Sequence, residues 1–267
     1  MKVYLNGKII DEKDAKISIH DHGFLYGDSV FETLKYKSGE VLNFEKHLKR
    51  LKNSAKIIEL KIPNVDIKQV IYSLIKENNL IQARIRVTLT RGENKYDFNT
   101  CVKPTLLITA VSFEDKVEWK IKGTKTCTLE IERPIPNMKT VQLLSNTLAR
   151  QKMKKLECDE CFLINRHGEI TEGSVSNFFV VKNGIIYTPP LKDCLEGTVR
   201  ENIFELCKSN NIKIEEKKIK YEELGKYDEA FWTNSPNQIV PIKTINDLEF
   251  ECVGIITQKL IKLLYEI

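Results

Sequence analysis

Two Asn-Gly pairs, each set between short apolar runs, constrain the fold of this chain more than any other feature. Asn6-Gly7 separates residues 3–5 from Ile9 and Ile10, and Asn183-Gly184 separates residues 177–182 from 185–188. Asn-Gly favours a two-residue hairpin turn because both central positions then take positive φ. The sequence therefore predicts antiparallel hairpins near its start and again in its second half.

Helical periodicity and strand alternation follow the first hairpin. Apolar residues within 44–58 and within 67–75 each fall on one helical face, and Asn43 is the predicted N-cap of the first helix. Residues 83–89 and 105–111 alternate as half-buried strands. A hairpin, two helices and further strands predict a small α+β unit.

The second part of the chain is richer in strands. Charged residues gather before it, which predicts an interdomain linker at 114–120. We expect a mixed α+β or α/β fold: a small α+β domain over 1–113 and a larger domain over 121–267 with a barrel-like sheet and peripheral helices. Two of those helices are predicted near 145–156 and 199–209.

Composition excludes several classes of protein. The 267 residues are 42% hydrophobic and 30% charged, which is ordinary for a globular domain. The net charge of +5 forms no basic stripe with interleaved aromatics, so we expect no nucleic-acid partner. No apolar run is long enough to predict a membrane span. Seven cysteines without a regular framework favour a reducing cytoplasm, and the Cys158/Cys161 and His20/His22 pairs lack the further ligands of a metal site.

Three segments carry the chemistry that the sequence suggests. They are SIHDHGFLYGDSVFET at 18–33, PNMKTVQLLSNTLARQK at 136–152 and TEGSVSNFF at 171–179. Lys139 stands in the second segment, after a proline-rich stretch and just before a predicted helix. A lysine is usually a solvated surface charge, and its position alone gives Lys139 only some interest.

In this order and spacing the three segments resemble the class IV, fold-type IV pyridoxal-phosphate enzymes. The family includes branched-chain and D-amino acid aminotransferases and aminodeoxychorismate lyase, and the motifs are most similar to the lyase. The resemblance runs from about Val3 to Ile242. It implies pyridoxal 5′-phosphate as cofactor and Lys139 as the lysine that forms the aldimine. Gln142 departs from the asparagine usual in the lysine motif.

The same resemblance implies the residues that bind the cofactor. A glutamate pairs with the pyridine nitrogen and keeps it protonated, so that the ring accepts electrons. Arginine, backbone amides at a helix N-terminus and a hydroxyl hold the phosphate. Thr198 and Glu201 are also spaced as a capping box, which predicts that a helix begins there. The implied cofactor-binding residues are Arg50, Glu172, Asn177, Thr198, Val199 and Ser235.

Candidates for substrate binding are less sharply defined. Phe31 lies where some relatives carry an active-site tyrosine, and Arg91 and Lys95 follow or end a predicted strand. Arg84 and Arg86 are further candidates to bind a substrate carboxylate. Strand alternation predicts only that these two share a face of the sheet.

The motifs favour one reaction and leave a second open. The segment GFLYGDSVFET at 23–33 and the Thr233-Asn234-Ser235 stretch resemble 4-amino-4-deoxychorismate lyase, a folate-biosynthesis enzyme that would form 4-aminobenzoate and pyruvate through the Lys139 aldimine. The alternative is a class IV amino acid aminotransferase, of the branched-chain or D-amino acid type, that passes the amino group to a 2-oxo acid. A binding protein without turnover is a third possibility. The resemblance also implies a cytoplasmic homodimer acting on a small amine or amino acid.

Overall fold

The computed structural model describes residues 1–93 and 103–265, and these divide into two compact units. The first unit comprises Met1–Glu114 together with Met138–Gln142, and the second comprises Asp115–Asn137 together with Leu143–Ile267. A short piece around Lys139 therefore belongs to the first unit, although both of its neighbours along the chain belong to the second.

A six-stranded sheet forms the first unit, in the order β2-β1-β6-β5-β3-β4. The predicted first hairpin is confirmed, since Leu5 pairs with Lys8 and the turn residues Asn6 and Gly7 have φ of 47° and 95°. The strands are β1 (Lys2–Leu5), β2 (Lys8–Asp11), β3 (Ser29–Lys37), β4 (Glu40–Val41), β5 (Ala83–Thr90) and β6 (Thr105–Ser112).

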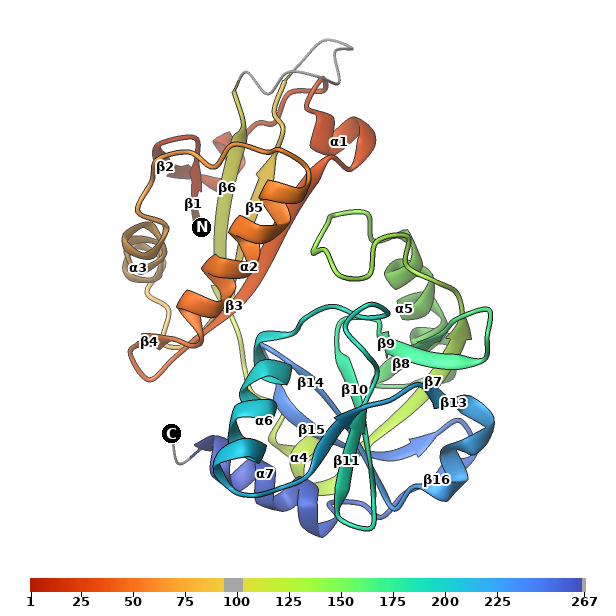
Figure 1. Cartoon of the computed structure of the whole chain (residues 1–267). Coiled ribbons are helices and arrows are strands. Elements are labelled where there is room, and N and C mark those ends of the chain that lie inside the picture. Colours follow the sequence, from red (N-terminus) through yellow and green to blue (C-terminus); the bar gives the residue numbers. More distant parts are fainter. Residues whose placement is uncertain (94–102, 266–267) are drawn as a thin grey trace. The chain divides into compact units, whose positions relative to one another are not determined.

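Two longer helices accompany this sheet, α2 (Phe44–Ile57) and α3 (Ile67–Glu77), and α2 runs along the strands in Figure 1. Asn43 occupies the predicted N-cap of α2 but makes no side-chain cap bond, because it adopts a left-handed conformation with φ of 54°. A 3₁₀ turn, η1 (Glu12–Asp14), and the short helix α1 (His22–Tyr26) precede β3.

Alternation along β3 and β5 gives the two faces of this sheet different roles. Val30, Leu34 and Ile85 are buried in the apolar core that contains residues of α2 and α3. Side chains at the intervening positions, among them Phe31 and Arg86, therefore lie on the other face. The faces are fixed by the register, in which β3 and β5 pair along their whole length.

The second unit is built on a ten-stranded curled sheet in the order β12-β11-β10-β14-β15-β7-β8-β9-β13, with β16 paired to β15. The Asn183-Gly184 hairpin is confirmed here, between β10 and β11. The strands are β7 (Thr124–Glu130), β8 (Glu160–Ile164), β9 (Glu169–Gly173), β10 (Asn177–Lys182), β11 (Ile185–Thr188), β12 (Ile214–Glu216), β13 (Ile219–Lys220), β14 (Glu229–Asn234), β15 (Gln238–Ile245) and β16 (Leu248–Glu249).

Helices cover the second sheet from outside. Apolar residues of α6 (Thr198–Ser209) and α7 (Ile255–Tyr265) pack against β10, β14 and β15, and those of α5 (Leu144–Leu156) pack against β7 and β8. A separate cluster around Phe162, Phe178 and Trp232 lies on the opposite face of the sheet. The remaining elements are α4 (Val117–Lys122) and a 3₁₀ segment, η2 (Tyr221–Lys226).

Helix α4 includes most of the predicted linker. Residues 115–120 belong to the second unit, because Trp119 packs edge-on against Trp232 with ring centroids 5.7 Å apart. Over the described parts of the chain, none of the helices combines the length and apolar character needed to cross a membrane.

The core of the first unit makes a direct stability prediction. Ile71 on α3 is fully buried, whereas Ile81 is 88% exposed. Ile71→Ala should lower the free energy of unfolding by about 2–5 kcal/mol because it removes packed methyl groups and leaves a cavity. Ile81→Ala should change it by less than about 0.5 kcal/mol. Urea unfolding followed by circular dichroism measures both, and equal losses would contradict this description of the core.

Candidate active site

Lys139 is held at an edge of the first unit's sheet. The amide of Phe31 donates to the carbonyl of Lys139 at 3.0 Å, and the amide of Val141 donates to the carbonyl of Ser29 at 3.4 Å. Val30 and Thr140 form an antiparallel bridge between these two bonds. The segment around Lys139 therefore adds to the start of β3, on the side where β4 pairs only with the strand's far end.

Two basic side chains lie over the ring of Phe31. Lys139 Nζ lies 4.8 Å from the ring centroid, and Cζ of Arg86 lies 3.8 Å from it. Burial lowers the pKa of Arg86, and the charge of Arg84 lowers it further. Arg84 and Arg86 share a sheet face as predicted, and it is Arg86 that contacts the same ring as Lys139. A cation desolvated in this way attracts an anionic group strongly.

Arg50 is fixed by a buried acid. Its Nε donates to Glu32 Oε1 at 2.8 Å and its Nη2 donates to Oε2 at 2.7 Å, which is the bidentate geometry of a strong ion pair. His47, one helical turn before Arg50 on α2, has Nδ1 2.7 Å from the same Oε2. Glu32, which lies in the segment 18–33 but was not among the predicted site residues, therefore orients the predicted phosphate ligand.

The charges of this trio follow from their surroundings. Burial opposes ionisation of Glu32, but the charge and hydrogen bonds of Arg50, with help from His47, lower its pKa to about 2. Burial lowers the pKa of His47, and the charges of Arg50 and Lys139 add to that effect, against the opposing influence of Glu32. A neutral His47 donates its Nδ1–H to the carboxylate, which only accepts.

Of the other two predicted substrate-binding cations, Arg91 is hydrogen-bonded to an acid and a backbone carbonyl of the first unit. Arg91 Nη2 donates to Asp28 Oδ1 at 3.1 Å and to the carbonyl of Ile58 at 2.7 Å, and its Nε donates to Asp28 Oδ2. These bonds engage the guanidinium within the first unit. Lys95 lies outside the described residues.

In the second unit, Glu172 has a donor on each carboxylate oxygen. Arg133 Nη1 donates to Oε1 at 2.5 Å, and the amide of Leu195 donates to Oε2 at 3.1 Å. Both side chains of the ion pair are buried. The predicted partner of the pyridine nitrogen is thus held in place from two sides.

A buried acid also supports the turn that follows Glu172. Glu160 accepts hydrogen bonds from the hydroxyls of Ser174 at 2.5 Å and Ser176 at 2.8 Å. Glycine is needed at 173, because a Cβ there would lie 2.0 Å from Ser176 Oγ. Burial raises the pKa of Glu160, while these hydroxyls and two backbone amides oppose that rise.

Asn177 connects this turn to the start of α6. Its Nδ2 donates to the carbonyl of Leu195 at 2.7 Å, and a Cβ on Gly197 would lie 1.9 Å from its Oδ1. Gly197 is the N-cap residue and provides no side-chain cap. The predicted helix start is confirmed, but Thr198 is the first residue inside the helix and not the cap residue of the predicted capping box.

The start of α6 suits an anion. Thr198 and Val199 are buried in its first turn, where backbone amides lack partners within the helix and the helix dipole is positive. Ser235 follows the end of β14, and two residues earlier the buried hydroxyl of Thr233 has no hydrogen-bond partner among the described residues. Thr233 pairs with Asn177 across β14 and β10. Its hydroxyl is therefore placed to bind a polar ligand near Asn177.

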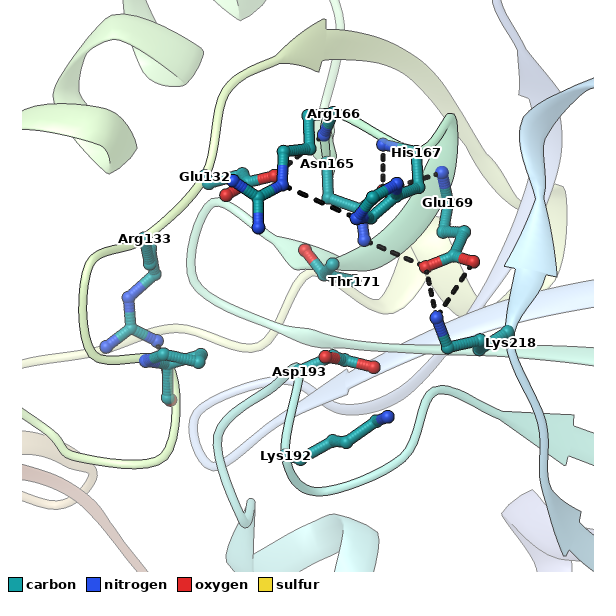
Figure 2. Close-up of a pocket in the computed structure, with 11 residues that line it drawn as sticks. Glu132, Arg133, Asn165, Arg166, His167, Glu169, Thr171, Lys192, Asp193 and Lys218 are labelled. Atoms are coloured by element: carbon teal, nitrogen blue, oxygen red, sulfur yellow. Dashed lines mark hydrogen bonds and ion pairs between the residues drawn. The ribbon is translucent and has the colours of Figure 1, made fainter.

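Arg133 also lines a polar cavity of about 270 Å³ in the second unit. Figure 2 shows Arg133 apart from a bonded group around Glu169, in which Lys218, just before β13, donates to both carboxylate oxygens at 3.1 Å. Arg166 lines the same cavity. Its Nε lies 3.4 Å from Nε2 of His167.

Sequence reasoning missed Arg133 as a partner of Glu172 and left the place of Arg86 open. Arg133 gives no local signal, because its partner lies on β9. His47 and Arg50 did carry a local signal, because residues three apart share a helix face. Glu32 lies on β3, so only the folded structure brings it to them.

Comparison with known proteins identifies the family. The model of the class IV amino-transferase family matches residues 29–245. A putative branched-chain-amino-acid aminotransferase of Methanocaldococcus jannaschii is 36% identical over 97% of this chain and 94% of its own length. A D-alanine aminotransferase of Staphylococcus epidermidis is 32% identical over 97% and 95%. The aminodeoxychorismate lyase of Bacillus subtilis is 30% identical over 93% and 88%.

Solved structures agree with the fold. The branched-chain amino acid aminotransferase of Escherichia coli superposes with a TM-score of 0.90 at 25% identity, covering 100% of this chain and 94% of that one. The branched-chain aminotransferase of Thermoproteus uzoniensis superposes with a TM-score of 0.89 at 29% identity and the same coverage.

The chain belongs to the class IV aminotransferase family. The predicted fold type and enzyme class are confirmed, and so is the predicted cofactor, because enzymes of this family use pyridoxal 5′-phosphate.

The Glu32–Arg50 pair makes the stability depend on acid pH. Because the pKa of Glu32 falls to about 2 in the folded state, this pair stabilises the fold fully above the unfolded pKa near 4.5 and loses that effect as the pH falls to about 2. The full contribution is roughly 3 kcal/mol.

Glu32→Gln should therefore unfold more easily at pH 7 and lose less stability than the wild type between pH 4.5 and 2. Glu45→Gln, on the exposed side of α2, is the control. Urea unfolding at several pH values measures the difference. An identical pH profile for wild type and Glu32→Gln would contradict the assignment.

Proposed function

We propose that this chain is a pyridoxal-phosphate enzyme that removes a proton from the amine-bearing carbon of a small carboxylate substrate. The observation that carries the proposal is the shared contact of Lys139 Nζ and Arg86 with the ring of Phe31. One residue there can take a proton and the other can receive a carboxylate. Phe31 supplies an apolar surface that keeps water from both.

The residues present fit the cofactor. Arg50 in the first unit and the first turn of α6 in the second each suit a phosphate group, because each offers positive charge and N–H donors. The unpartnered Thr233 hydroxyl and the nearby Ser235 add polar groups. Glu172 supplies the negative charge that a protonated ring nitrogen needs, and Asn177 orients the loop that bonds to Glu172. Pyridoxal phosphate supplies an aldehyde that bonds amines covalently and a ring that accepts electrons.

Lys139 then has two tasks in this proposal. Its amine holds the cofactor between turnovers, and after the substrate amine replaces it, Nζ accepts the proton from the amine-bearing carbon. Arg86 binds a carboxylate of the substrate by charge-assisted hydrogen bonds and so fixes which carbon faces Lys139. Glu32 and His47 keep Arg50 in one orientation throughout.

Within the family we propose 4-amino-4-deoxychorismate lyase as the particular activity. The segment 23–33, the Thr233-Asn234-Ser235 stretch and the similarity to the Bacillus subtilis lyase support it. In that reaction, loss of the proton to Lys139 is followed by elimination of pyruvate, and the substrate ring becomes aromatic as 4-aminobenzoate. The enzyme would then belong to folate biosynthesis.

An amino acid aminotransferase is the second candidate, and the names of the Methanocaldococcus and Staphylococcus relatives favour it. The amino group would then stay on the bound cofactor while the donor leaves as a 2-oxo acid, and a second 2-oxo acid would take up the amino group in the other half-reaction. Proton removal by Lys139 is common to both reactions.

We also propose that the chain works as a homodimer in the cytoplasm. Exposed apolar side chains gather before and on α1, including Ile19 at 71% and Phe24 at 73% exposure, and a second copy would cover them. All six described cysteines are free, which supports a reducing compartment.

The decisive experiment supplies or withholds an amino acceptor. The holoenzyme with 4-amino-4-deoxychorismate should release 4-aminobenzoate and pyruvate in equal amounts without any 2-oxo acid. Turnover of an amino acid that depends strictly on 2-oxoglutarate or pyruvate as acceptor would make the chain an aminotransferase. Lys139→Ala should abolish turnover, and Lys155→Ala, an exposed lysine on α5, should not. No reaction under either condition would overturn the proposed function.

Arg86 gives a separate kinetic test. Arg86→Met should lower kcat/KM about tenfold to a hundredfold, mainly through KM, because it removes a charge-assisted bond of about 1.5–3 kcal/mol. Arg84→Met removes a cation from the same face of the same strand without the Phe31 contact, and should change kcat/KM less than about threefold. Equal effects of the two substitutions would contradict the role given to Arg86.

A further inference from the structure

Arg133 makes an unusual contact for a residue outside the predicted site. Its guanidinium is 8% exposed and Glu172 is 6% exposed, so the ion pair between them is shielded from water. Nη1 donates to Glu172 Oε1 at 2.5 Å. The acid that faces the cofactor in the proposed function therefore already shares its negative charge with a cation.

The loop that carries Arg133 fixes the direction of its guanidinium. Nη1 also donates to the carbonyl of Pro136 at 3.2 Å, and Nη2 donates to the carbonyl of Ile135 at 3.4 Å. These bonds lie within four residues of chain, so they hold the guanidinium against Glu172 with little freedom. Lys139 follows three residues after Pro136 in the sequence.

The other oxygen of Glu172 is engaged as well. Leu195 donates its backbone amide to Oε2 at 3.1 Å, from the loop just before α6. A carboxylate with a cation on one oxygen and an amide on the other carries less negative charge to offer a further donor.

We propose that Arg133 sets how firmly the cofactor's ring nitrogen keeps its proton. This inference rests on the proposed function, in which Glu172 pairs with that nitrogen. The guanidinium of Arg133 is hydrogen-bonded to the same carboxylate that stabilises the ring proton. The positive charge of Arg133 also repels that proton. Arg133 thus lowers the proton affinity of the ring nitrogen, and with it the ability of the ring to accept electrons. It acts through Glu172 as a positioning residue.

A merely structural role for Arg133 predicts something different. If it only fastened the loop 133–136 to β9, its loss would change stability or cofactor affinity without changing the proton affinity of the ring nitrogen. A measurement on that nitrogen separates the two roles, whereas a loss of activity would not.

The test uses pyridoxal 5′-phosphate labelled with ¹⁵N in the ring, bound to the full-length protein and titrated with pH by NMR. In Arg133→Met the pH at which the ring nitrogen loses its proton should rise by about one unit or more, a tenfold increase in proton affinity. Arg133→Gln, which keeps a donor and removes the charge, should shift it in the same direction. Arg133→Lys should stay close to the wild type.

Arg166→Met is the matched control, because Arg166 lines the same cavity in Figure 2 but does not contact Glu172. It should leave the midpoint unchanged. Unchanged midpoints in both neutral Arg133 variants, or the same shift in Arg166→Met, would overturn the inference alone. Failure of the wild type to bind the labelled cofactor would overturn the proposed function, and this inference with it.

Discussion

The account depends on one pair of backbone hydrogen bonds, those that add the segment around Lys139 to the start of β3. Residues far apart in the sequence meet there, with Phe31 donating to Lys139 and Val141 to Ser29. A lysine side chain on a free loop would be a mobile, hydrated charge. Fixed at a sheet edge, its amine instead lies against an aromatic ring that also carries Arg86.

Charge compensation is the second theme of the structure. Arg50 is bound by Glu32 in the first unit, and Glu172 is bound by Arg133 in the second. Burying such ions costs free energy that their mutual attraction and hydrogen bonds must offset, and the same contacts also hold both side chains in one orientation. Each pair fixes a group that the family resemblance assigns to the cofactor. The residues of each unit are thus oriented by contacts within that unit.

Local patterns in the sequence predicted the elements well and their long-range partners poorly. The Asn-Gly turns, the amphipathic helices and the alternating strands depend on neighbouring residues and were correctly predicted. Whether Arg86 or Arg84 meets Phe31 depends on the register of β3 and β5, which lie far apart in the sequence. Arg133 has no signal of its own, and the helix start at Thr198 was mistaken for a cap because Gly197, shaped by its contact with Asn177, takes that role.

The most direct measurement of the central claim is chemical. The protein is incubated with pyridoxal 5′-phosphate, reduced with borohydride and digested, and the peptides are analysed by mass spectrometry. Our account predicts that the cofactor is fixed to Nζ of Lys139, the amine held at the edge of β3. Attachment to a different lysine, or no attachment at all, would contradict it.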